Sequence, residues 1–149
     1  MALSWKPKFK ANDIRAFVLK KIEVVENIVF DQLQQVGEQF VADARSLNTY
    51  KDRTSNLRGS IGYIIVKDGK EVFGNFDGTQ EGQSTAKKLI RSVRASYPKG
   101  YALIVVAGMN YGLYVESKGY DVLTGSSLIA EDNLKGAFRR LQTALRKVK

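Results

Sequence analysis

Residues 109–123, MNYGLYVESKGYDVL, bring together residue types that can support acid–base chemistry. The segment holds one glutamate, Glu116, and three tyrosines, Tyr111, Tyr114 and Tyr120. A carboxylate can act as a general base and a phenol as a general acid when both face one substrate. The alternative is structural: the rings pack and dock, with Tyr111, Tyr114 and Val115 together on the preceding strand. Glu116 then pairs with an arginine or caps a backbone amide. These two interpretations separate an enzyme from a structural protein.

The composition limits the chemistry available in the rest of the chain. The 149 residues include no cysteine and no histidine. Disulfides, thiolate nucleophiles, imidazole catalysis and zinc sites built from these ligands are therefore excluded. The two common glycine-rich phosphate-binding patterns are absent, and residues 77–85, DGTQEGQST, read better as a loop and helix cap than as an anion or calcium site. We expect no enzyme activity, cofactor, metal or small-molecule substrate.

The net charge of +9 is unevenly placed along the chain. Residues 1–21 hold six basic side chains and one acid, whereas residues 22–50 hold five acids and one arginine. A further basic row at helical spacing can face a polyanion and consists of Lys87, Lys88, Arg91 and Arg94. Basic helix faces are also commonly solvated, and cations suit the end of a helix. Non-specific nucleic-acid binding is therefore an alternative function.

The elements that position these residues begin with one long helix. Apolar side chains recur every three or four residues from Asn12 to about Leu47, which predicts a helix with Asn12 or Asp13 as its cap. A helix of this length is long for a small domain. It either breaks near Gly37 or extends beyond the body and packs against something else.

A β-hairpin follows the long helix. Residues 61–66 and 71–76 are rich in β-branched and aromatic side chains, and the Asp68-Gly69 pair between them is the signal of a type I′ turn. Residues 86–95 are predicted to form a helix capped by Ser84 or Thr85. The apolar run 101–109, YALIVVAGM, then predicts a central strand that is buried on both faces.

The chain closes with a further predicted helix, capped by Ser126 or Ser127. Its expected buried side consists of Leu128, Leu134, Phe138, Leu141, Leu145 and Val148. The order of elements predicts one α+β domain over residues 1–149, with a flexible basic arm at residues 1–11. The fold is a long N-terminal helix, a small, largely antiparallel sheet with a hairpin, and a C-terminal helix packed on one face. No run approaches the ~18 apolar residues that span a bilayer, so we expect a soluble intracellular protein without membrane contact.

Two short motifs resemble a known family. The first holds Thr54, then Asn-Leu-Arg at 56–58 and Ser-Ile at 60–61, and the second holds Tyr111, then Tyr-Val-Glu at 114–116 and Gly119. Together they resemble the pattern tGxLrxSI…V…YaxyvExG of the tail-component family of long-tailed bacteriophages and prophages. Members of that family complete the tail or join it to the head. Ser55 stands where the family usually has glycine, and tail completion, tail terminator and connector all remain open as subtypes.

The resemblance implies a non-enzymatic virion structural protein, assembled in the cytoplasm of a bacterial host. It implies a homo-oligomer, a ring at the neck of the particle, that contacts other tail or connector proteins. Basic clusters on such a ring can touch DNA non-specifically. The residues that we expect at its interfaces are Arg53, Arg58, Asp68, Gly69, Lys70, Tyr111, Tyr114, Glu116 and Tyr120.

Overall fold

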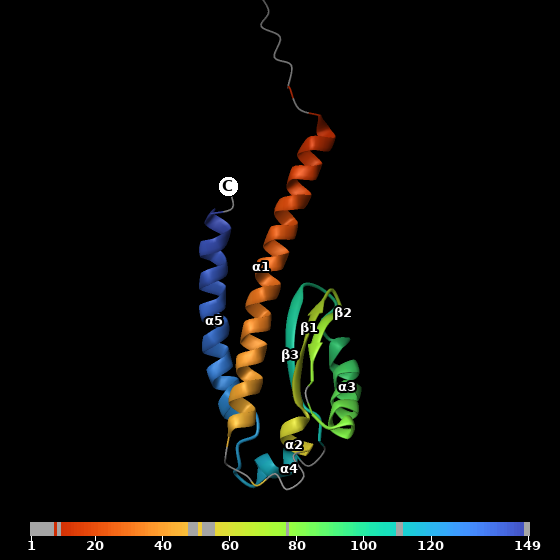
Figure 1. Ribbon diagram of the computed structural model, residues 1–149, viewed down its shortest axis with the longest axis vertical. Helices are drawn as coiled ribbons and strands as arrows, with labels where there is room; N and C mark the ends of the chain where they lie inside the picture. Colours follow the sequence, from red (N-terminus) through yellow and green to blue (C-terminus); the bar gives the residue numbers. More distant parts are fainter. Residues whose placement is uncertain are drawn as a thin grey trace, which may run out of the picture.

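The computed structural model describes residues 8, 10–47, 51, 56–76, 78–109 and 112–147. These ranges form five helices and three strands, which are labelled in Figure 1. Their bounds are α1 Ala11–Ser46, α2 Asn56–Gly59, β1 Ile61–Lys67, β2 Lys70–Asn75, α3 Gln80–Arg94, β3 Tyr101–Ala107, α4 Gly112–Ser117 and α5 Thr124–Lys147. The predicted α+β class, with a long N-terminal helix and an antiparallel sheet, is confirmed.

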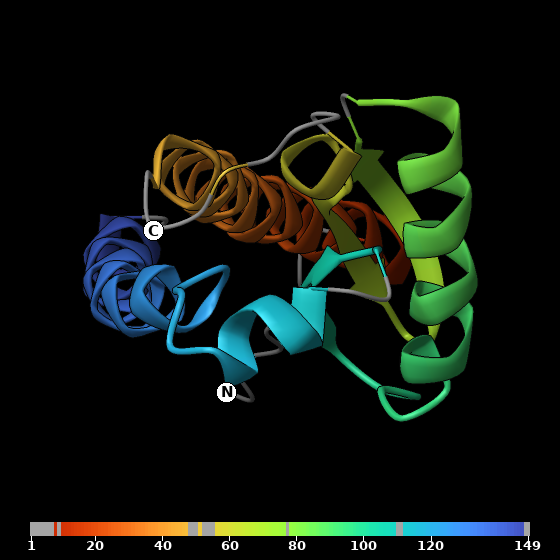
Figure 2. The ribbon, with the colours of Figure 1, turned by 90° about the horizontal axis from the view of Figure 1, so that it is seen from below.

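The elements are stacked in layers, which Figure 2 shows in the order α5, α1, sheet and α3. Helix α1 covers one face of the sheet and α3 covers the other. Helix α5 runs antiparallel to α1 and joins the body mainly through it. The C-terminal helix therefore adds an outer layer on α1 and does not cover the sheet directly.

The central strand is β1, because the antiparallel sheet has the order β2-β1-β3. All six residues from Ile61 to Val66 are buried. Tyr63 and Ile65 face α1, whereas Ile64 and Val66 face α3. The prediction of residues 101–109 as the central strand is wrong: β3 lies at the edge. An edge strand that helices cover on both faces carries the same apolar run as a central one, so its sequence does not reveal its position.

Two helix starts differ from the prediction. Helix α1 is preceded by Lys10, whose backbone N–H donates to Asp13 Oδ2 at 3.0 Å, so Asp13 lies inside the first turn. Helix α3 begins at Gln80, six residues earlier than expected, and its cap is Thr79, whose Oγ1 accepts from Gly82 N at 3.3 Å. Gly82 lies in this polar first turn, and a glycine there makes the helix hard to recognise from the sequence. Glycine is needed at this position because Ser60 lies too close for a side chain.

Helix α1 does not break at Gly37. The glycine lets the helix approach β1 closely, since a Cβ at this position would lie 2.6 Å from two ring carbons of Tyr63. The Tyr63 ring is fully buried, and its hydroxyl donates to Glu38 Oε1 at 2.8 Å. Burial and this hydrogen bond raise the pKa of Tyr63 well above its ordinary value. Gly37 and Tyr63 are therefore a single packing unit between helix and sheet.

The N-terminal part of α1 extends beyond the body, as Figure 1 shows. Nearly every residue from Ala11 to Val24 is exposed, including large apolar side chains. The second alternative for the long helix, extension past its own core, is therefore correct.

Replacement of Gly37 by alanine is expected to destabilise the protein. The methyl group would force Tyr63 or the helix to move, and overpacking of this kind costs about 1–3 kcal/mol of the free energy of unfolding. Urea unfolding measures it, with Gly136→Ala in α5 as the matched control. A Cβ at Gly136 meets only the end of the Arg140 side chain, at 3.5 Å, so this variant is expected to gain up to about 1 kcal/mol from helix propensity. Equal effects of the two substitutions would contradict the close-packing role of Gly37.

Candidate functional site

The segment with candidate chemistry folds into a short helix and a turn. Helix α4 is followed by Gly119, whose φ of 82° allows the chain to turn sharply before Tyr120. The chain then enters α5 at Thr124. The expected turn at Gly119 is confirmed, and it brings Glu116 of α4 to the start of α5.

Glu116 caps α5. Its Oε1 accepts hydrogen bonds from the backbone N–H groups of Val122 at 3.2 Å, Leu123 at 2.8 Å and Thr124 at 3.1 Å. The Thr124 hydroxyl lies 3.1 Å from the same oxygen. Backbone amides at a helix start otherwise lack partners. Of the alternatives for this side chain, capping of backbone amides is therefore correct.

A second acid completes the cap. Both carboxylate oxygens of Asp121 accept from Gly125 N, at 3.0 and 3.1 Å. A Cβ at Gly125 would lie 2.1 Å from Asp121 Oδ2, so this contact requires glycine. The predicted cap by Ser126 or Ser127 is wrong, because the helix begins before them: Ser126 is buried and Ser127 bonds to Thr124 O inside the first turn.

The surroundings of Glu116 favour its charged form. Burial by itself raises the pKa of the carboxyl group, but the hydrogen bonds from Leu123, Thr124 and Val122 outweigh it, so the pKa of Glu116 lies below its ordinary value. A general base near neutral pH works best with a pKa close to that pH. The carboxylate of Glu116 is instead committed to holding α4 against α5.

The aromatic residues of the segment lie differently from the prediction. Tyr111 is outside the described residues. Tyr114 was expected to pack on the preceding strand, but it is 62% exposed, beside Leu113 at 80%. Lys118 Nζ lies 5.3 Å from the centroid of its ring. Val115, which was expected to pack beside Tyr114, is half-buried against the core, so the packing prediction is correct for this residue.

Tyr120 is also exposed, at 49%. Together with Leu113 and Tyr114 it gives the α4 end of the molecule an apolar surface, which we call the α4 surface. The docking role that was expected of Tyr114 and Tyr120 stays a prediction.

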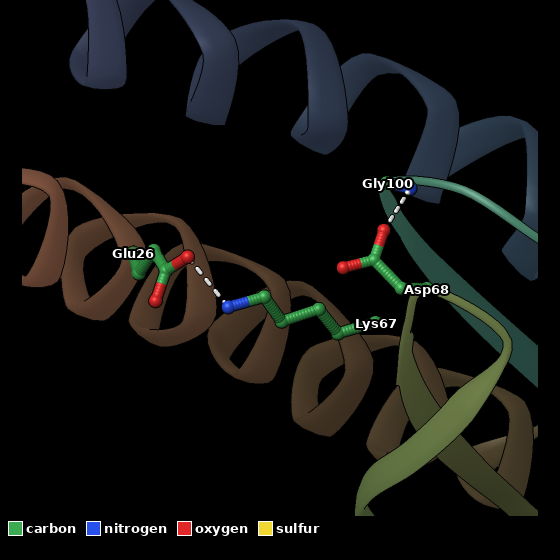
Figure 3. Close-up of polar contacts among 4 residues, drawn as sticks. All are labelled: Glu26, Lys67, Asp68 and Gly100. Atoms are coloured by element: carbon green, nitrogen blue, oxygen red, sulfur yellow. Dashed lines mark hydrogen bonds and ion pairs between the residues drawn. The ribbon is translucent and has the colours of Figure 1, made fainter.

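The hairpin tip is fastened to the body, as Figure 3 shows. Asp68 and Gly69 have φ values of 49° and 74°, which fits the predicted type I′ turn. Asp68 Oδ1 accepts from Gly100 N at 2.8 Å, and the amide of Asp68 donates to Gly100 O at 2.9 Å. These groups of Asp68 are engaged within the chain, while the residue itself is exposed, so its role at an interface stays a prediction. Lys70, at the start of β2, is exposed.

Next to the tip, Lys67 Nζ forms an ion pair with Glu26 Oε1 at 2.5 Å (Figure 3). The same Nζ lies 5.6 Å from the centre of the Tyr101 ring. The hydrogen bond to Glu26 raises the pKa of Lys67. Sequence reasoning missed this contact, since 41 residues separate its members and no local pattern links them. It fixes the tip of the hairpin to the middle of α1.

The two arginines expected at an interface have different outcomes. Arg53 lies outside the described residues. Arg58 Nη2 donates to Leu47 O, just past the end of α1, at 2.6 Å, and Arg45 Nη2 similarly donates to Ile61 O at 2.7 Å. Arg58 therefore has an internal structural role, which the Asn-Leu-Arg motif did not reveal. A charge reversal at Arg58 would disturb the fold before it tests an interface.

The basic row on α3 lies away from the sheet. Ala86 and Ile90 are the buried residues that face it. Three side chains of the basic row are exposed, namely Lys87, Lys88 and Arg91. The fourth, Arg94, is half-buried. Arg91 and Arg94 lie in the last turn, where a cation suits the helix dipole. The helix dipole therefore explains the positions of two of these four basic residues, and no bound polyanion is needed to explain them.

The buried side of α5 differs from the prediction. The large side chains Leu128, Phe138 and Leu145 are exposed, whereas Ser126 and Ala137 are buried. Leu134 and Leu141 are half-buried, so the prediction is correct in part. Val148 lies outside the described residues.

An apolar groove of about 300 Å³ opens between α1, α5 and the start of β3. We call it the α1–α5 groove; it is lined by Val29, Gln32, Leu33, Tyr101, Leu134, Ala137, Phe138 and Leu141. No Asp, Glu, Lys or Arg is among these lining residues. The groove is suited to apolar side chains.

Within the described ranges, no three acidic side chains are grouped so that they could hold a metal ion. None of the described helices is both long and apolar enough to cross a membrane. Comparison of the chain with protein-family models, curated proteins and solved structures found no significant match. The resemblance to phage tail components therefore depends on the sequence motifs alone and is carried forward as a proposal.

Replacement of Glu116 by alanine is expected to lower the free energy of unfolding by about 1–2 kcal/mol at neutral pH, since caps of this kind contribute that much. Because the pKa of Glu116 is lowered by folding, its contribution is complete above the ordinary pKa of glutamate and is lost as the pH falls through the folded-state pKa. The difference between wild type and variant should therefore shrink on acidification. Urea unfolding between neutral and acidic pH measures it.

The matched control is Glu131→Ala, which removes an exposed glutamate of α5 that pairs with Lys135 at 2.9 Å. Surface ion pairs contribute about 0–1 kcal/mol. If Glu116→Ala lowers the free energy of unfolding no more than Glu131→Ala does, or by an amount that does not change with pH, the role of Glu116 as a charged cap is contradicted.

Proposed function

We propose that the protein is a non-enzymatic structural part of a phage or prophage virion, acting at the tail or the head–tail junction by oligomerising. The observation that carries the proposal is the α4 surface, because it lies within the motif that resembles phage tail components. In that motif Tyr114 is exposed while its neighbour Glu116 is used internally. The motif thus combines a structural cap with outward apolar side chains.

The distribution of exposed apolar residues supports an assembling protein. Monomeric soluble proteins rarely expose large continuous apolar patches, and such patches mark interaction sites. Here exposed apolar side chains occur at both ends of the molecule: at the α4 surface and on the first half of α1. Two separate apolar surfaces are what a subunit needs in order to contact both its own copies and a neighbouring virion protein.

The alternative function is non-specific nucleic-acid binding. The net charge of +9 and the exposed lysines Lys87 and Lys88 support it. Around a DNA passage, weak and salt-sensitive attraction would be useful because the DNA has to slide. Binding below micromolar Kd at physiological salt, with a steep salt dependence, would favour nucleic-acid binding as the primary function.

The proposal is tested by deleting the gene from the phage or prophage that carries it and examining the particles by electron microscopy. We expect incomplete tails or unjoined heads and tails, and we expect the protein itself in purified wild-type particles by mass spectrometry. Complete, infectious particles from the deletion strain would overturn the proposal.

Complementation tests the α4 surface. The double variant Leu113→Ser, Tyr114→Ser should fold normally, since both side chains are largely exposed. If these side chains are buried on docking, their loss weakens binding at least about tenfold. The variant should therefore restore less than about a tenth of the wild-type titre. The control is Leu89→Ser on α3, 45% exposed, which should restore the titre fully. Full rescue by the double variant would remove the α4 surface from the proposal.

A further inference from the structure

Strand β3 has a hydrogen-bonded neighbour on one side only, because it lies at the edge of the sheet (Figure 1). In an antiparallel pair, residues that bond to the neighbouring strand alternate with residues whose backbone groups point away from it. Gly108 N, just past the end of β3, donates to Ser60 O at 3.2 Å. Gly100 O, just before its start, accepts from Asp68 N at 2.9 Å. The register of the pair therefore assigns the bonds with β1 to the even-numbered residues of β3.

The odd-numbered residues of β3 direct their backbone groups away from β1. They are Tyr101, Leu103, Val105 and Ala107, and all four are half-buried. Among the hydrogen bonds in the part of the chain that the structure describes, none involves the backbone N–H or C=O of these residues. Each such group needs a hydrogen-bond partner from protein or water. The outer edge of β3 thus presents donors and acceptors in the order that a further strand would satisfy.

The other edge of the sheet is protected. Strand β2 begins with Lys70 and Glu71, which are both exposed. Its register with β1 shifts so that Val72 is an extra residue. Charges and irregularities of this kind hinder pairing with another strand. Strand β3 has neither, since YALIVVA contains no charge and no proline and its register with β1 is regular throughout. Of the two edges, β3 is therefore the one that can accept a strand.

The surroundings of this edge are apolar on both faces of the sheet. On the α1 face, Tyr101 lines the α1–α5 groove together with Leu33 and Phe138. On the α3 face, Ile104 belongs to the cluster around Ile90. A strand that continues the sheet here has to be apolar on both faces, which is a property of β3 itself. Strand β2 of another copy would instead bring Lys70 and Glu71 to this edge.

Strand β3 is also complementary to itself. When two copies pair antiparallel with Ile104 opposite Ile104, Tyr101 lies opposite Ala107 and Leu103 lies opposite Val105. All four odd-numbered residues of each copy then exchange hydrogen bonds, about eight in total. A register shifted by two residues leaves one of the four unpaired in each copy. The register centred on Ile104 also places the large ring of Tyr101 opposite the small side chain of Ala107.

We propose that the β3 strands of two copies pair antiparallel across a two-fold axis at Ile104, which joins the two three-stranded sheets into one. This inference deepens the proposed function, on which it depends for its role in a virion, by naming the partner and the contact. The same surface is used by both copies, so the contact closes after two. A ring built from this protein would therefore need a further contact.

Other kinds of partner fit the edge less well. A helix has its backbone groups bonded internally and cannot satisfy those of a strand. The backbone of DNA is a row of negatively charged acceptors, which matches neither the N–H and C=O alternation nor the apolar surroundings. A strand that is apolar on both faces satisfies the two features together, and pairing of this kind is a common mode of recognition.

Hydrogen exchange of the purified chain, followed by NMR, tests the pairing. Protection of the outward amides of Leu103 and Val105 should rise at least about tenfold between about 50 µM and 1 mM. The internal control is the amide of Ile104, which bonds to β1 and should be protected at both concentrations. Sedimentation velocity over the same range should show a dimer that forms in step with the protection.

A proline tests the edge without removing a bond to β1. Leu103→Pro eliminates an outward N–H, and an edge strand tolerates proline at such a position. Leu103→Ala is the matched control, because it removes the same side chain and keeps the N–H. The proline variant should dimerise at least about tenfold more weakly than the alanine variant, since each dimer loses two hydrogen bonds. A cooperative urea transition confirms that each variant folds.

Disulfide formation tests the register. The chain has no cysteine, so a single introduced cysteine can pair only with that of a second copy. Ile104→Cys should form an intermolecular disulfide on mild oxidation, because the opposed Cα atoms would lie about 4.5 Å apart, within the range of a disulfide. Ala102→Cys, on the same face of β3, should not, because Ala102 lies opposite Val106 of the second copy.

Several results would overturn the inference: a wild-type protein that stays monomeric up to about 1 mM, equal weakening by proline and alanine, or crosslinking at residue 102 as readily as at 104. Protection of the outward amides that does not depend on concentration would also overturn it, since another segment of the same chain would then cover the edge. The measurements use the isolated chain and no phage particle. Loss of the inference therefore leaves the deletion experiment above unaffected, and complete particles without the gene would leave the dimer unaffected.

Discussion

The close approach of α1 to β1 at Gly37 and Tyr63 is the contact on which the rest of the molecule depends. With no Cβ at Gly37, the helix lies directly on the Tyr63 ring, which also packs against Phe73 with ring centroids 5.9 Å apart. The polar contacts on either side follow the same interface: Lys67 with Glu26 towards one end and Arg45 with Ile61 O towards the other. Since α5 packs on α1, the position of α1 on the sheet also sets the position of the outer layer.

Within the described residues, three polar side chains that the sequence suggested for partners are used to hold this arrangement. Arg58 binds the end of α1, Asp68 binds Gly100, and Glu116 binds the start of α5. A side chain with its hydrogen bonds already made gains little from a partner and loses stability when it is changed. The candidate residues that stay exposed are of two kinds: the apolar and aromatic side chains of the α4 surface, and the basic side chains Lys70, Lys87 and Lys88.

The elements were predictable where local signals decide the structure. The 3.6-residue period over α1 and the Asp68-Gly69 turn identified the longest helix and the hairpin. The errors arose where the outcome depends on which element covers a face. The apolar run of β3 does not distinguish an edge from a centre, and α5 buries Ser126 and Ala137 while Phe138 stays exposed. The partners of Glu116 and Lys67 depend on tertiary packing, and only a capping role for Glu116 was foreseen.

The projecting half of α1 illustrates how a packed body can keep an exposed helix folded. A separate helix of about 14 residues is marginal in water because its first turn is costly to form. Here the helix only needs to continue from the half that is packed on the sheet, and continuation adds one hydrogen bond for each residue fixed. Its apolar side chains are thus held in helical positions before any partner arrives. Because less order has to be imposed on binding, a small contact of this kind can form at a lower entropic cost than one made by an unfolded segment.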